Sequence, residues 1–151
     1  MPSGRGPLNY TTTIDAHKSA AEAVALLARH GASRISMDLK DRQPAGLAFG
    51  IDTPAGMRFY VLPANPEGVY RALDKACRRG DIPPRYVDRD HALRVAWRVL
   101  LSWLDAQLAL IDAQVVEMEQ VMLPYLIVDE VGTTLWHRYL DHGRQAIEAA
   151  E

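Results

Sequence analysis

The tripeptide Asp38-Leu39-Lys40 is the best candidate for catalytic chemistry in the sequence. Residues two apart in a β-strand point to the same face, so the carboxylate and the amine would lie side by side. In many metal-dependent nucleases such a carboxylate holds Mg²⁺ while the lysine orients a water molecule. The site also needs an acid on a neighbouring strand, which only Asp52 could supply. The alternative, which we favour, is a charged outer face of a strand.

No other set of residues has the spacing of a known active site. Cys77 lies beside Arg78 and Arg79, but no histidine is placed to serve it as a base, so we expect a structural cysteine. The glycines of the predicted hairpins do not form a phosphate-binding loop. The histidines lack metal-ligand spacing: His17, His30, His91, His137 and His142. We therefore predict no catalytic residue, no metal site and no cofactor.

The composition indicates one globular domain. The chain has 151 residues, of which 48% are hydrophobic and 24% charged, which excludes a disordered protein. A single cysteine excludes a disulfide framework within the chain. No apolar run reaches the roughly 18 residues of a membrane span, and the N-terminus has no hydrophobic signal-peptide region. We expect a cytoplasmic protein that does not enter a membrane.

The charge is unevenly distributed along the chain. Residues 71–102 contain eight basic and four acidic side chains, whereas residues 103–151 contain two basic and nine acidic ones. Such a polarity is typical of a basic surface that contacts phosphate or an acidic protein. The alternative, which we favour, is that the two segments pair with each other in the fold.

The first half of the sequence predicts strands around one helix. Residues 9–14 are β-branched and predict a short strand, and a helix follows over about 16–30, with Asp15 as its N-cap and Gly31 after its end. Alternating apolar residues predict three further strands, which begin at Arg34, Leu47 and Met57. Turns at 44–46 and 53–56 make these strands an antiparallel meander. We expect Met57, Phe59 and Val61 on its inner face and the side chains Arg34, Lys40, Arg58 and Tyr60 on its outer face.

The second half predicts helices. Asn65 caps a helix that Gly80 ends, and Asp88 caps a helix over about 89–112 that is apolar around most of its circumference and therefore central. A short helix ends near Pro124, and the last one spans about 133–149, with Leu135, Trp136, Tyr139 and Leu140 on one side. The prediction is an α+β fold: a small antiparallel sheet (β-α-β-β-β), then a helical half with one long buried helix. Residues 1–7 form a flexible tail and residues 8–151 a single domain, with its sheet part at 8–63 and its helical part at 65–151.

Two surfaces are candidates for binding. Phosphate contacts would come from arginines of the basic segment, with one further arginine and a base-stacking tyrosine as secondary candidates: Arg78, Arg79, Arg85 and Arg89, then Arg58 and Tyr60. A pI near 6.2 argues against a dedicated DNA-binding domain. A protein interface would come from an apolar segment that the small sheet does not obviously cover: Met122, Leu123, Tyr125, Leu126 and Ile127. If this segment is an interface, self-association is its commonest use. The alternative is that the segment belongs to an ordinary hydrophobic core.

The sequence from Tyr10 to Leu126, about three quarters of the chain, resembles a family of small proteins encoded by phages and prophages. The matching stretches are YTTTI (10–14), LARHGASRI (27–35), LPAN (62–65), AWRVLLSWLDAQ (96–107) and VMLPY (121–125). Members of this family have no assigned activity, so the resemblance implies no catalytic residues. It implies a mobile-element origin, and with it a role in DNA replication or recombination or in blocking a host system.

Three hypotheses follow from the sequence. The first is a non-enzymatic binding protein of phage type that acts on DNA or DNA-processing complexes, as a small homo-oligomer. The second is a protein-interaction module that inhibits or redirects a host enzyme or defence system, with a host or phage protein as its partner. The third is the metal-dependent nuclease built on Asp38 and Lys40.

Overall fold

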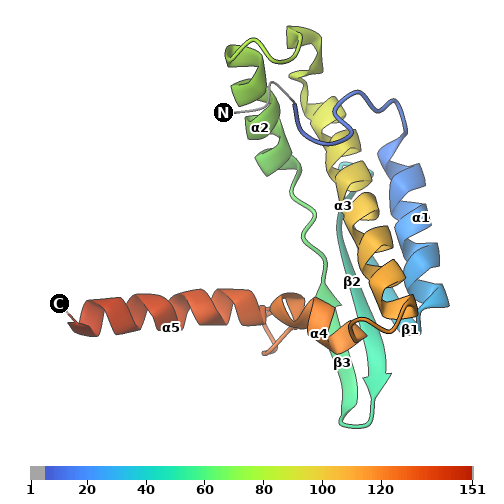
Figure 1. Ribbon diagram of the computed structural model, residues 1–151, viewed down its shortest axis with the longest axis vertical. Helices are drawn as coiled ribbons and strands as arrows, with labels where there is room; N and C mark the ends of the chain where they lie inside the picture. Colours follow the sequence, from blue (N-terminus) through green and yellow to red (C-terminus); the bar gives the residue numbers. More distant parts are fainter. Residues whose placement is uncertain (1–5, 151) are drawn as a thin grey trace.

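A computed structural model describes residues 6–150 of the chain. Its helices and strands are, in order, α1 (Ala16–Arg29), β1 (Ala32–Lys40), β2 (Gln43–Thr53), β3 (Gly56–Val61), α2 (Pro66–Arg78), the 3₁₀ turn η1 (Pro84–Tyr86), α3 (Arg89–Asp112), α4 (Met118–Met122), the 3₁₀ turn η2 (Leu123–Tyr125) and α5 (Leu135–Ala150). The α+β class, the antiparallel sheet and the long helix are confirmed (Figure 1). Of the predicted flexible tail 1–7, residues 1–5 lie outside the described part. The Pro7 carbonyl accepts a hydrogen bond from the Tyr10 amide.

The helix boundaries follow from their caps. Asp15 accepts a hydrogen bond from the His17 amide at 2.7 Å and begins α1. Asn65 and Asp88 begin α2 and α3 in the same way, and all three caps confirm the sequence prediction. Gly31 follows α1 with a φ of 97°, a conformation that suits glycine.

The sheet has three strands in the order β1-β2-β3, all antiparallel. The hairpin between β1 and β2 turns at Asp41 and Arg42, both with positive φ, and not at 44–46 as predicted. A two-residue turn of this type matches the twist of the strands. Pro44 therefore lies inside β2, where a register irregularity between Asp38 and Leu39 accommodates a residue that cannot donate to the ladder.

The predicted strand over residues 9–14 is wrong. Residues 8–11 form a turn with Asn9 at a φ of 61°, and residues 12–15 are irregular. Side-chain hydrogen bonds take the place of the backbone hydrogen bonds that a strand would make. Thr12 Oγ1 accepts one from the Ile14 amide, and Asn9 Nδ2 donates one to Ser102 Oγ. The Tyr10 ring packs edge-on against Tyr86 at 5.2 Å, which holds this segment against the helical part.

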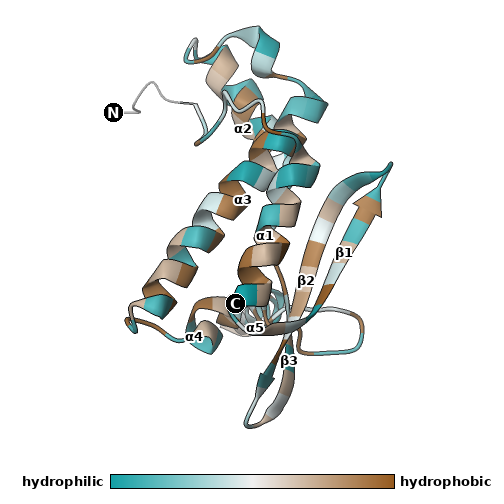
Figure 2. Ribbon diagram, turned by 90° about the vertical axis from the view of Figure 1, so that its right-hand side faces the viewer, coloured by the Kyte–Doolittle hydropathy of each residue, from teal (hydrophilic) through white to brown (hydrophobic). Residues whose placement is uncertain are grey.

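Helices α1 and α3 cover one face of the sheet and leave the other open (Figure 2). The main core lies between them and contains Leu27, Phe49, Trp97 and Leu104 among its buried residues. The Trp97 indole nitrogen donates to the Pro44 carbonyl at 2.9 Å, so α3 is fixed to the central strand. The long helix α3 is confirmed, but only nine of its 24 residues are buried and Leu110 is 41% exposed, so the predicted burial around most of its circumference is only partly right.

A smaller core joins α2, η1 and the start of α3. Leu73, Ala76, Ile82 and Ala92 are buried in it, and half-buried Cys77 packs against them. Figure 1 shows this lobe at one end of the long body and α5 leaving the body sideways near the other end. Among residues 6–150, no helix combines the length and apolar character that crossing a membrane requires.

Candidate functional site

The apolar segment predicted as a protein interface is used largely inside the chain. Met122 is fully buried in the main core, and the Tyr125 ring packs edge-on against Trp103 at 5.6 Å. Leu126 and Ile127 extend along β3, where the Ile127 amide donates to the Phe59 carbonyl at 2.8 Å. Of the five predicted interface residues, only Leu123 is a large side chain about half exposed. The core alternative therefore describes this segment better.

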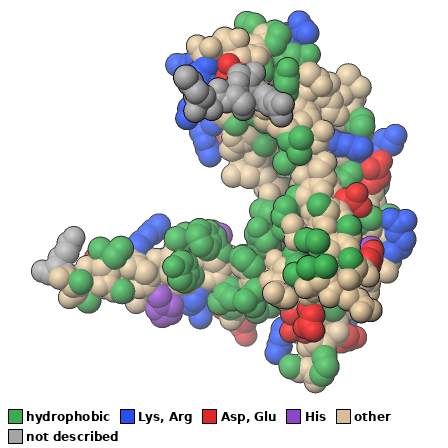
Figure 3. All heavy atoms as spheres, viewed as in Figure 1, with side chains coloured by type: hydrophobic (Ala, Val, Ile, Leu, Met, Phe, Trp, Pro, Cys, Tyr) green, Lys and Arg blue, Asp and Glu red, His purple; other side chains and the backbone are tan. Residues whose placement is uncertain are grey.

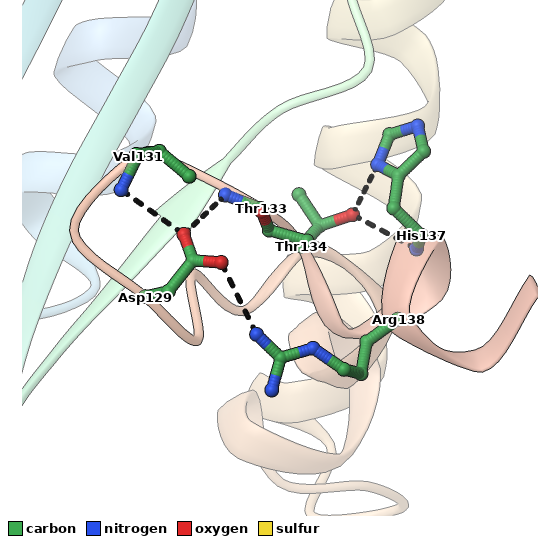
Figure 4. Close-up of polar contacts among 6 residues, drawn as sticks. All are labelled: Asp129, Val131, Thr133, Thr134, His137 and Arg138. Carbon is green, nitrogen blue, oxygen red and sulfur yellow. Dashed lines mark hydrogen bonds and ion pairs between the residues drawn. The ribbon is translucent and has the colours of Figure 1, made fainter. Parts of the chain in front are cut away.

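A hydrogen-bonded turn connects this segment to α5 (Figure 4). One carboxylate oxygen of Asp129 accepts from the amides of Val131 and Thr133, and the other lies 3.1 Å from the Arg138 guanidinium. Hydrogen bonds from Thr133, then from the Val131 amide, with the charge of Arg138, lower the pKa of Asp129. The Thr134 hydroxyl accepts from the His137 amide at 3.3 Å and caps α5. The turn thus sets where α5 starts.

An uncovered apolar face lies on α5. Of the sixteen described residues of this helix, none is buried. Trp136, Tyr139 and Ile147 are 49%, 66% and 65% exposed, although side chains of this kind are normally covered. At 100° per residue they share one face with smaller neighbours: Leu140, Gly143, Ala146 and Ala150. We call these seven residues the α5 stripe.

The α5 stripe is clearly separated from polar side chains. The rings of Trp136 and Tyr139 stack with their centroids 5.7 Å apart, which arranges the widest part of the stripe. The opposite face of the helix carries His137, Arg138, Asp141, His142, Arg144, Gln145 and Glu148. Figure 3 shows hydrophobic side chains along the projecting helix beside its junction with the body. The sequence signal was the spacing of Trp136, Tyr139 and Leu140, but it did not reveal that the face is uncovered.

The predicted phosphate-binding arginines lie on the surface of the α2 lobe, and most are engaged there. Arg78 pairs with Asp74 at 3.0 Å, Arg79 with Asp81 at 3.1 Å, and Arg89 with Glu67. The Arg89 and Arg85 guanidinium groups also lie over the rings of Tyr70 and Tyr86. The structure therefore gathers Arg78, Arg79, Arg85 and Arg89 in one lobe.

The pairing of the basic segment with the acidic C-terminal region, our favoured alternative, is wrong for the described residues. Their ion pairs join the arginines of 71–98 to acids that precede residue 82: Asp74, Asp81, Glu67 and, through Arg98, Glu22. One acid of the C-terminal region, Asp129, pairs within that region with Arg138. Acids outside the C-terminal region thus pair with Arg78, Arg79, Arg89 and Arg98, four of the eight basic residues of the segment.

Arg58 and Tyr60 do not face outward as predicted. Tyr60 is 2% exposed and stacks on Phe49 with ring centroids 5.3 Å apart, so it cannot stack on a base. Burial raises the pKa of its phenol. Tyr60 pairs with Phe49 across the strands and Arg58 with Ile51, which places both on the helix-covered face. Phe59 instead occupies the open face, over Gly50.

The elements of the nuclease hypothesis are separated. Asp38 pairs with Gly46 of β2, and Asp52 lies six residues further along that strand, a separation of about 20 Å. These two carboxylates cannot share a metal ion. Among residues 6–150, no group of three or more His, Cys, Asp and Glu side chains could hold one. Asp38 and Lys40 are exposed on β1, as the alternative of a charged strand face requires.

Comparisons of this chain with models of protein families, with curated proteins and with solved structures found no match. The resemblance to phage and prophage proteins therefore stays a prediction, and the functional argument depends on the geometry of this chain.

Proposed function

We propose that this protein is a protein-binding module whose contact surface is the α5 stripe. The observation that carries the proposal is the exposure of Trp136, Tyr139 and Ile147 on a helix that leaves the body of the domain. Isolated helices of about this length are marginal in water, and burial of an apolar face is what normally stabilises them. Exposed apolar faces of this kind mark sites where another molecule docks.

The charges on α5 favour a protein partner over a lipid surface. Helices that lie on membranes usually carry many Lys and Arg side chains on their polar face. The polar face of α5 has two arginines, Arg138 and Arg144, balanced by the acids Asp141 and Glu148. Such a balanced face has little attraction to anionic lipids. A helix with one apolar stripe and mixed flanking charges fits a groove or another helix.

Photo-crosslinking in cells that produce the protein tests this function. A benzophenone amino acid replaces Tyr139 in the stripe or, as the matched control, Gln145 on the polar face. We expect a discrete crosslinked protein product from position 139 and little from position 145. Products of equal yield from both positions, or crosslinks from position 139 to lipid alone, would contradict the proposal.

Nucleic-acid binding is a second candidate, supported by a specific arrangement on α2. Arg71, Lys75, Arg78 and Arg79 recur at helical spacing, so their exposed side chains share one face of the helix. Arg71 and Lys75 form no ion pair with any described residue. The pairs made by Arg78 and Arg79 are exposed and therefore weak, and a phosphate could displace them. A cytoplasmic location and a phage or prophage origin remain predictions from the sequence.

A further inference from the structure

We propose that the groove between α1 and α3 binds a free α-amino acid with an apolar side chain. The inference goes beyond the proposed protein-binding function, because the groove lies on the two helices that cover the sheet and shares no residue with the α5 stripe. It follows from the size of the groove, from two opposite charges on its walls and from the apolar residues between them.

The groove is a cavity of about 390 Å³ that is open to solvent. Its walls repeat the spacing of one helix face on both sides: Glu22, Ala25, Leu26 and Arg29 on α1, and Arg98, Leu101, Ser102 and Asp105 on α3. The volume falls within the range of roughly 300–1,000 Å³ that is usual for sites of small molecules. Figure 3 shows basic and acidic side chains side by side over this part of the body. The groove therefore offers both signs of charge to one bound molecule.

Two of the four charged residues on the walls have no partner. Glu22 and Arg98 pair with each other at 3.1 Å at one end of the groove. Arg29 on α1 and Asp105 on α3 line its other end. Within residues 6–150 neither of them takes part in an ion pair, and both side chains are exposed. The groove thus keeps one cation and one anion free for a ligand.

These two charges on opposite walls favour a small zwitterion. A guanidinium group binds a carboxylate through two parallel hydrogen bonds, and a carboxylate accepts hydrogen bonds from an ammonium group. In a free α-amino acid the carboxylate and the ammonium group are attached to the same carbon atom. One such molecule would therefore contact Arg29 with its carboxylate and Asp105 with its ammonium group. A simple carboxylic acid or a simple amine would satisfy only one of the two walls.

The residues between the charges favour an apolar side chain on that amino acid. Leu26 and Leu101 lie between the charged residues of their helices and belong to the packing of the main core, so their positions are fixed. Ser102 Oγ accepts a hydrogen bond from Asn9 Nδ2 at 3.1 Å and donates one to a carbonyl of α3 at 3.0 Å, so it is already occupied. An aliphatic side chain would remove apolar surface from water against the two leucines.

NMR titration of the isotope-labelled full chain with L-leucine tests this site. We expect saturable shifts of the amide signals of the groove residues, with a Kd of about 1 mM or lower. Leucinamide lacks the carboxylate and isocaproate lacks the amine, so each should bind roughly tenfold more weakly than L-leucine. Absence of saturation by L-leucine, shifts confined to another part of the molecule, or equal binding of the three compounds would overturn the proposal.

Two substitutions in the groove assign the charges to the two groups of the ligand. Arg29→Gln should weaken L-leucine about tenfold and remove its advantage over leucinamide, whereas Asp105→Asn should remove its advantage over isocaproate. Arg144→Gln and Asp141→Asn make the same chemical changes at exposed positions of α5 and should bind L-leucine like the wild type. Wild-type affinity in either groove variant, or an equal loss in the α5 variants, would contradict binding between Arg29 and Asp105.

Discussion

Arg138 in the first turn of α5 lies 3.1 Å from the carboxylate of Asp129, in the turn that precedes the helix. The same carboxylate accepts hydrogen bonds from the amides of Val131 and Thr133. The Asp129 side chain therefore connects the end of the body to the start of the projecting helix. This turn is attached to β3, because the Ile127 amide donates a hydrogen bond to the Phe59 carbonyl. The direction of α5 is therefore fixed by hydrogen bonds, although none of its side chains is buried.

Asp129→Asn should destabilise this turn in a pH-dependent way. The folded-state pKa of Asp129 lies below its ordinary value of 3.8, so its contribution to stability is present above that value and is lost as the pH falls through the lowered pKa. We expect the variant to melt below the wild type near pH 7 and the difference to disappear in strong acid. Thermal melts at several pH values measure this. Glu130→Gln, next in the chain and exposed, is the control, and an equal loss in that variant would contradict the assignment.

The pair of His30 and Asp112 should stabilise the protein below neutral pH. His30 Nε2 lies 3.0 Å from the Asp112 carboxylate and joins the ends of α1 and α3. Its pKa is raised above 6.5, first by the hydrogen bond to Asp112 and then by that to the Leu26 carbonyl. A histidine whose pKa is higher in the folded than in the unfolded state stabilises the fold. This contribution is complete below the pKa of the unfolded state and is lost as the pH rises through the pKa of the folded state. His30→Gln should therefore lower the stability near pH 5.5 by about 0.5 kcal/mol and have little effect near pH 9. His17→Gln is the exposed control, and an effect of His30→Gln that is equal at both pH values would refute the pair.

The basic face of α2 should bind polyanions if the second candidate function holds. Arg78→Ala with Arg79→Ala removes two cations, so binding to labelled DNA should weaken and the slope of log affinity against log salt should fall by roughly 2. Fluorescence anisotropy of single- and double-stranded DNA at several salt concentrations measures both quantities. Arg34→Ala with Arg144→Ala, two exposed arginines on β1 and α5, removes the same charge elsewhere. Affinity unchanged in the α2 double variant would eliminate this site.

Gly50 should be required because Phe59 lies over it on the open face of the sheet. A Cβ atom at Gly50 would lie 2.9 Å from the Phe59 ring, too close for ordinary contact. Gly50→Ala should therefore cost about 1–2 kcal/mol of unfolding free energy, and Phe59→Ala in the same chain should recover part of that loss. Urea denaturation of the two single variants and the double variant gives the coupling. Additive losses would mean that the ring does not press on this position.

Local signals in the sequence predicted the helices well. Asp15, Asn65 and Asp88 are caps whose side chains act on amides two or three residues away, so the signal and its effect lie together in the sequence. Apart from the misplaced turn between β1 and β2, the failures involve distant partners. Alternation in β3 fits either face, and the pairing of Tyr60 with Phe49 decides which side is buried. Residues 9–14 have strand composition, but their partners are Ser102 and Tyr86.

The proposed binding surface was partly visible in the sequence. The apolar spacing from Trp136 onward predicted one face of a helix, and the aromatic residues on it were evident. Whether the chain covers that face depends on where the turn at Asp129 directs α5, which no local pattern specifies. The interface was instead predicted at residues 122–127, because apolar residues are denser there. Trp103 and β3, which pack against this segment, come from other parts of the sequence.

Hydrogen–deuterium exchange of the α5 amides in the purified protein tests the central claim most directly. A bare helix of this length opens readily, whereas a helix packed on a partner is protected. The account predicts that the amides of α5 exchange more slowly when the protein partner captured through position 139 is added at saturating concentration than in the protein alone. Tyr139→Glu should abolish this dependence, and Gln145→Glu should preserve it. Exchange of α5 that is equally fast with and without that partner, or unaffected by Tyr139→Glu, would contradict protein binding through the α5 stripe.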